Sequence, residues 1–98
     1  MASKTPPDSA NFEQETLLEF PCKFPVKAMG RNEDGFKALI TDIVLSHAEI
    51  YDGERITANP SSSGNYVSIT VTIDARSKAQ LDKIYQDLTD CEQVLMAL

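Results

Sequence analysis

The clearest pattern along this chain is a strict alternation of apolar and hydroxylated side chains in residues 66–73. Its apolar members are all β-branched and share one parity, which is typical of a strand with one buried and one open face. The pattern consists of Val67, Ile69, Val71 and Ile73 alternating with Tyr66, Ser68, Thr70 and Thr72. The polar run in residues 61–65 contains a glycine and predicts a hairpin loop. This loop joins the strand to an earlier one, which we place at residues 54–59.

Two other segments carry apolar residues at helical spacing. In the first, residues recur at intervals of three and four from Phe36 to His47, so the helix is expected to end near Ala48. Asn32 is its predicted N-cap, followed by two carboxylates in the first turn. The second helix is expected to begin at Ser77 with a capping box and to stop by residue 90. Its apolar stripe is Leu81, Ile84, Tyr85 and Leu88.

Two shorter segments complete the set of elements. Residues 24–29 predict a first strand that Gly30 ends, and the apolar residues 93–98 predict a last one. The order β-α-β-β-α-β predicts an α+β protein with a ferredoxin-like βαββαβ sandwich, in which a four-stranded antiparallel sheet carries two helices on one face. Right-handed crossovers would place the first and third strands in the centre.

A chain of 98 residues is long enough for one domain with a single core. Residues 1–15 are polar and contain few apolar side chains, which predicts a disordered N-terminal tail. The folded domain is expected over residues 16–98. The chain shows no internal repeat and no second linker.

The net charge of −6 makes nucleic acids and anionic membranes unfavourable partners. Residues 1–19 contribute half of this charge, because one lysine stands there against four carboxylates. No apolar run approaches the ~20 residues of a membrane span, and the N-terminus lacks the layout of a secretion signal. We therefore expect a cytoplasmic protein, in which Cys22 and Cys91 remain reduced and have no special role.

Candidate catalytic chemistry is sparse. His47 is the only histidine, and its place at the end of an apolar stripe favours a structural role. One histidine and two distant cysteines cannot assemble a metal site, and nothing indicates a cofactor. We expect no catalytic residues and no metal or cofactor, and hence a protein that is not an enzyme. The least favoured alternative is an enzyme that uses residues 61–66.

Several short stretches together resemble the YbeD-like family of small, uncharacterised bacterial proteins. They are Leu-Leu-Glu-Phe-Pro at residues 17–21, Lys-Ala-Met-Gly at 27–30, the serine loop and strand at 60–70, and Val-Leu-Met-Ala-Leu at 94–98. The resemblance covers residues 17–98. It implies a ferredoxin-like fold similar to the ACT regulatory domain, and it implies no established activity.

A weaker resemblance is to the ACT domain itself, whose loop after the first strand has an Asn or Asp, then two residues, a Gly and an aliphatic residue. Residues 32–36, Asn-Glu-Asp-Gly-Phe, match loosely. This likeness implies a small ligand such as an amino acid, bound near a subunit interface. An ordinary capped helix start predicts the same letters. In the serine loop, hydroxyl and backbone N–H groups could serve an anion, although a plain hairpin needs the same residues. The candidate ligand-binding residues are Gly30, Asn32, Gly35, Ser62, Ser63, Gly64 and Asn65.

The open face of the sheet is a candidate interaction surface for another protein or for a homodimer partner. Its predicted members are Lys27, Met29, Tyr66, Ser68, Thr70 and Thr72. Water covers many such faces, which is the simpler alternative. The favoured hypothesis is a non-enzymatic binding or regulatory module that acts through protein contacts. The second is an ACT-like sensor of a small molecule such as an amino acid.

Overall fold

The computed structural model describes residues 19–98, and its elements follow the predicted order. The described residues form six helices and strands: β2 (Cys22–Arg31), α2 (Phe36–Leu45), β3 (Thr57–Pro60), β4 (Tyr66–Ala75), α3 (Lys78–Asp90) and β5 (Val94–Ala97). The predicted tail at residues 1–15 lies outside the described part of the chain. No helix within residues 19–98 has the length and apolar character needed to cross a membrane.

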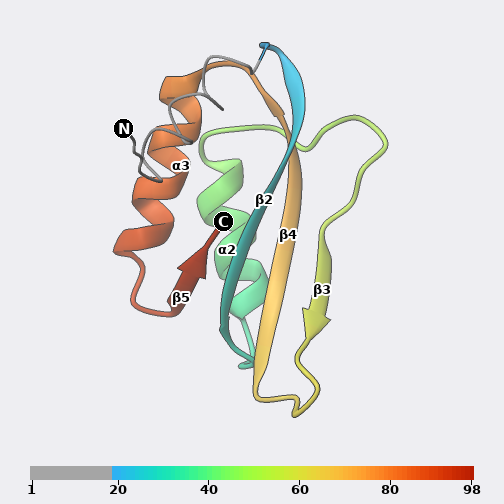
Figure 1. Cartoon of the computed structure of the whole chain (residues 1–98), viewed down its shortest axis with the longest axis vertical. Coiled ribbons are helices and arrows are strands. Elements are labelled where there is room, and N and C mark those ends of the chain that lie inside the picture. The colour runs from blue at the N-terminus through green and yellow to red at the C-terminus, as the bar shows by residue number, and fades with distance from the viewer. Residues whose placement is uncertain (1–18) are drawn as a thin grey trace, which may run out of the picture.

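The four strands form one antiparallel sheet in the order β3-β4-β2-β5, with β5 and β3 at opposite edges (Figure 1). The two central strands are the first and third along the chain, as predicted. β2 is longer than expected because it pairs with β4 over ten positions, from Cys22 opposite Ala75 to Arg31 opposite Tyr66. β3 starts later than predicted, at Thr57, and ends at Pro60.

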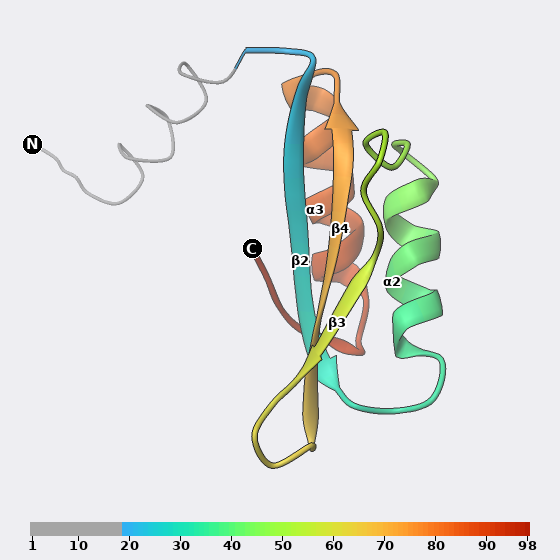
Figure 2. The same ribbon diagram turned by 90° about the vertical axis from the view of Figure 1, so that its right-hand side faces the viewer.

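Both helices pack on the same face of the sheet and against each other, away from the C terminus (Figure 2). The alternation that predicted β4 places its apolar side chains under them, so the predicted ferredoxin-like α+β fold is confirmed. α3 begins and ends as predicted. The core consists of Val26, Ala28, Phe36, Ile40, Val44, Val67, Ile69, Val71, Ile73, Ala75, Leu81, Ile84 and Leu88.

The start of α2 differs from the prediction. Asn32 is not its N-cap, and neither carboxylate lies in its first turn. The chain turns into the helix at Gly35, whose φ of 87° is a left-handed conformation that glycine adopts without a steric penalty. The helix then ends at Leu45, before the predicted Ala48.

Of the two hydrogen bonds in the capping box predicted for α3, the structure confirms one. The Ser77 hydroxyl accepts a hydrogen bond from the Gln80 backbone N–H at 3.1 Å, as the capping box requires. The Gln80 side chain does not return to Ser77, because its oxygen accepts from the Arg76 N–H at 2.6 Å and its amide donates to the His47 carbonyl at 3.0 Å. Gln80 thus joins α3 to the end of α2.

Candidate functional site

The most prominent surface feature is an apolar edge along β5. Leu95, Met96 and Leu98 are 59%, 49% and 67% exposed, more than any other large apolar side chain in residues 19–98. A monomeric protein normally protects such an edge with charges, prolines or a covering segment. The opposite edge strand, β3, follows this rule with polar residues and Pro60. β5 itself carries no charged residue.

A β-bulge explains why consecutive residues of β5 are exposed. Val94 pairs with Gly30 and Met96 with Met29, so Leu95 is an extra residue between two adjacent pairs. Ala97 then returns to the helix-covered face opposite the buried Ala28. The bulge therefore leaves two large apolar side chains uncovered in succession.

The chain end beyond β5 is held on β2 and α3. The backbone of Leu98 exchanges hydrogen bonds with that of Lys27, at 2.8 and 3.1 Å, and Leu98 O also accepts a hydrogen bond from the Tyr85 hydroxyl at 2.5 Å. Burial raises the pKa of Tyr85 to about 12, so the phenol keeps its proton and stays a donor at neutral pH. These bonds fix the position of the exposed Leu98 side chain.

A column of cations on β2 lies beside this apolar edge. Lys23, Lys27 and Arg31 share the parity opposite to the buried Val26 and Ala28, so they project from the helix-free face. Lys23 forms an ion pair with Glu54 at 2.6 Å, and the hydrogen bond to Glu54 raises the pKa of this lysine.

The other two cations of this column form no ion pair with another residue of the described chain. Arg31 lies over the Tyr66 ring at 5.9 Å. Within the described chain, neither Lys27 nor Arg31 has a carboxylate at salt-bridge distance. We call the combined surface the β2–β5 strip and define it as Lys27, Met29, Arg31, Leu95, Met96 and Leu98. A shallow hollow of about 50 Å³ lies between Lys27, Met29, Ser68, Met96 and Leu98.

The predicted interaction face overlaps this strip only in part. Lys27 and Tyr66 are exposed, and Met29, Ser68 and Thr70 are half-buried. Thr72 is a correction, because only 8% of its surface is accessible. Pro25 of β2 pairs with Thr72 on one side. On the other side, the Tyr51 backbone N–H donates a hydrogen bond to the Thr72 carbonyl at 2.9 Å.

Sequence reasoning missed the role of β5. The apolar residues 93–98 predict a closing strand, but the five consecutive apolar residues 94–98 contradict the alternation of a half-buried strand. Because successive side chains of a strand point to opposite faces, about half of that run had to face away from the core. This was the signal available in the sequence.

The structure brings together the two loops of the predicted ligand site. The Asn32 side chain donates to the Gly64 carbonyl at 3.0 Å, and its backbone N–H donates to the Asn65 carbonyl at 2.9 Å. The serine loop, however, largely satisfies its own polar groups. The N–H groups of Gly64, Asn65 and Tyr66 donate to oxygens of Ser61 or Ser63 within that loop. These three donors are therefore not available to an anion in this conformation.

Two small hollows border the loop that follows β2. One of about 150 Å³ is lined by Glu33, Asp34, Gly35, Phe36, Leu39 and Gln93. A second of about 260 Å³ is lined by Arg31, Glu33, Glu92, Gln93 and Leu95. The predicted ligand residue Gly35 lines the first, whereas Gly30 is buried under β5 and serves packing.

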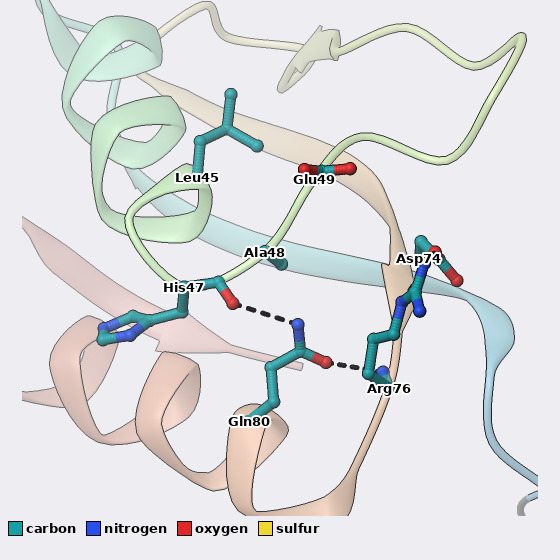
Figure 3. Close-up of a pocket in the computed structure, with 7 residues that line it drawn as sticks. All are labelled: Leu45, His47, Ala48, Glu49, Asp74, Arg76 and Gln80. Carbon is teal, nitrogen blue, oxygen red and sulfur yellow. Dashed lines mark hydrogen bonds and ion pairs between the residues drawn. The ribbon is translucent and has the colours of Figure 1, made fainter.

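A larger hollow of about 370 Å³ lies where the end of α2, the end of β4 and the start of α3 meet (Figure 3). Its lining is Leu45, His47, Ala48, Glu49, Asp74, Arg76 and Gln80. Most of its polar side chains already bond to the protein: Arg76 to Asp74 at 2.8 Å, and Gln80 to both Arg76 and His47. The His47 ring contacts Asp87 of α3 at 2.6 Å, so the histidine connects the two helices. This hollow is better explained as the place where the end of α2 is bonded to α3 than as a ligand site.

No cluster of three or more potential metal ligands occurs among residues 19–98. Cys22 and Cys91 are partly buried free thiols. The Cys91 thiol contacts the Gln93 side chain at 3.4 Å. Neither cysteine lies in the β2–β5 strip.

The comparisons with known proteins agree with the family resemblance seen in the sequence. The family model described as a protein of unknown function, DUF493, matches residues 15–98. A UPF0250 protein of Nitrosomonas europaea is 41% identical over 85 residues, which cover 87% of this chain and 98% of that protein. A UPF0250 protein of Neisseria meningitidis is 42% identical over 83 residues, which cover 85% and 91%. The chain belongs to the DUF493 (UPF0250, YbeD-like) family of small bacterial proteins.

Proposed function

We propose that this protein is a non-enzymatic binding module that docks on a partner protein through the β2–β5 strip. The observation that carries the proposal is the exposed apolar edge of β5 beside two cations that form no ion pair with any carboxylate of residues 19–98. Contiguous exposed apolar surface next to polar groups is typical of interaction sites. The edge strand also offers backbone groups to an added strand.

The charges of the strip define the class of partner. Lys27 and Arg31 favour an acidic segment, although exposed ion pairs contribute only ~0–1 kcal/mol each. Burial of Leu95 and Met96 on β5 and of Leu98 just beyond it contributes more, at about 25 cal/mol per Å² of apolar surface. We therefore propose a partner segment that combines apolar anchors with carboxylates. The apolar contacts provide the affinity and the charges provide orientation.

Peptide selection tests this proposal. We expect random-peptide libraries displayed on phage to yield acidic, apolar binders whose NMR shift changes lie at Lys27, Met29, Met96 and Leu98. Met96→Glu should weaken their binding more than tenfold, because it places a carboxylate in the apolar edge. Leu45→Glu is the matched control, since Leu45 is also exposed but lies on α2, and it should leave the affinity unchanged. Equal loss in both variants, or binders that map elsewhere, would refute the proposal.

A second candidate function is the small-molecule sensor. It is favoured by the hollow that Gly35 and Phe36 line, together with the adjoining one. Their charged rim is mainly acidic, with Glu33, Asp34 and Glu92 against Arg31, so it suits the ammonium group of an amino acid or an amine better than an anion. In an NMR titration with amino acids, this function predicts shift changes at residues 31–36. Unchanged signals there across the full set would exclude it.

A further inference from the structure

We propose that the chain's own N-terminal segment, residues 11–18, occupies the part of the β2–β5 strip around Lys27, Met29, Met96 and Leu98 in the free protein. Its sequence, Asn-Phe-Glu-Gln-Glu-Thr-Leu-Leu, combines two carboxylates with three large apolar side chains. The strip presents the complementary set: Lys27, which has no carboxylate of residues 19–98 at salt-bridge distance, lies beside exposed leucine and methionine.

The point at which the segment joins the domain sets its reach. The chain enters the described structure at Glu19 and starts β2 at Cys22. If it reverses over residues 19–22, equal rise per residue places Leu18 level with Lys23 and Glu13 level with Ala28. Phe12 is then level with Met29.

The same register sets a limit to the contact. Arg31 is level with residue 10, beyond both carboxylates of the segment. Lys27 is therefore the cation that Glu13 and Glu15 meet, and Arg31 is not.

The edge of β2 determines how the segment lies. β5 pairs with β2 from Ala28 to Gly30, and Leu98 adds a pair at Lys27, so no strand within residues 19–98 lies beside the earlier half of β2 on this side. Alternate residues of a strand direct their backbone groups to the same edge. On the edge of β2 that faces β5, where the Lys27 backbone bonds to Leu98, the preceding residues are therefore Pro25 and Lys23. Proline has no N–H, so Lys23 is the single backbone donor that this part of the edge offers. A continuous backbone ladder is thus unavailable. Side-chain contacts over the open face must hold the segment.

Tethering makes such contacts sufficient. A segment linked directly to its site has an effective concentration of about millimolar, so an interaction of modest intrinsic affinity populates the docked state. Docked residues 11–18 would compete with an external acidic segment. This competition rests on the proposed function, whereas the docking itself does not.

NMR spectra of the full chain test the docking. Glu13→Gln combined with Glu15→Gln is expected to shift the amide signals of Lys27, Met29, Met96 and Leu98, and Lys27→Ala is expected to shift those of residues 12–17. In the Lys27→Ala background, the glutamine pair should no longer move the strip signals. Lys27 is exposed and lies outside the packed core, so its replacement by alanine should retain the fold.

Two charge-matched variants serve as controls. Arg31→Ala lies beyond the reach of both carboxylates, and Lys37→Ala lies on α2 in the helical layer. Both should leave the signals of residues 12–17 in place. Changes confined to residues 11–20 in the glutamine variant would overturn the proposal. Shift changes that vanish on dilution would also overturn the proposal, because dependence on concentration would mean that the segment contacts a second copy of the chain.

The peptide binders separate this inference from the proposed function. If the segment docks, the glutamine pair should bind a selected acidic peptide a few-fold more tightly than the natural chain, because the competing state is lost. Peptide binding at the strip with no response of residues 12–17 would overturn the docking and leave the proposed function intact. If residues 12–17 respond to Lys27→Ala but no peptide binds the strip, the docking would stand and the proposed function would be overturned.

Discussion

Gly30→Ala is expected to destabilise the domain by about 3 kcal/mol, a large part of the roughly 5–15 kcal/mol that holds a small domain folded. Gly30 faces the helices beneath the junction of β2 and β5. A Cβ atom there would lie 2.6 Å from two ring carbons of Phe36 and would also collide with the Gln93 backbone oxygen. Relief requires the first turn of α2 and the entry into β5 to move together. Urea unfolding followed by circular dichroism would measure the loss.

Gly64→Ala is the matched control for this substitution. Gly64 has a φ of 81°, so alanine is strained there, but its Cβ would have no neighbour within 4 Å. The expected cost is about 1 kcal/mol from the left-handed backbone alone. If Gly30→Ala cost no more than Gly64→Ala, the close contact of β2, β5 and Phe36 would be disproved. The bulge that exposes Leu95 and Met96 would then lose its structural basis.

Leu88→Ala is also expected to lower the free energy of unfolding by about 3 kcal/mol, but by removing packed atoms and not by adding them. Leu88 is fully buried on α3, the helix that packs against β4 and β5. Alanine removes three carbon atoms and leaves a cavity, while it retains or improves helix propensity. The loss therefore reports packing alone. Thermal and urea unfolding would both detect it.

Leu95→Ala makes the same chemical change at an exposed site. Leu95 is 59% exposed on β5, so its truncation should alter the free energy of unfolding by less than about 0.5 kcal/mol. It should nevertheless weaken the acidic peptides selected on the β2–β5 strip. A comparable loss of stability in both leucine variants would mean that β5 carries core packing and that its edge is not a free docking surface.

The extent to which the fold could be predicted varies with the element. The period-two alternation from Val67 to Ile73 specified β4 and its buried face, and the Ser77 cap located the start of α3. The start of α2 was misplaced because Asn32, an excellent cap residue, satisfies its side chain on Gly64 of a distant loop. The local preference of asparagine for a helix N-cap was overridden by this hydrogen bond, which joins residues 32 positions apart in the sequence.

The candidate site was predicted less well than the fold. The cation Lys27 and its neighbour Met29 were named from the parity of their strand, which is a local property. Leu95, Met96 and Leu98 were not named, because their exposure depends on β5 being an edge strand with a bulge. Thr72 was wrongly included, because the approach of Tyr51 to β4 cannot be read from either segment alone.

The sequence by itself determined the order of the elements, the buried face of each central strand and the family, because these follow from side-chain periodicity and local motifs. Only the tertiary structure decided which apolar residues of the described chain remain uncovered and which of its cations form no ion pair within residues 19–98. Both depend on what lies beside a strand, and strand neighbours are set by contacts between residues far apart in the chain. The β2–β5 strip is a product of that arrangement: β5 from the end of the sequence reaches β2 from its beginning, and the apolar edge comes to lie beside Lys27.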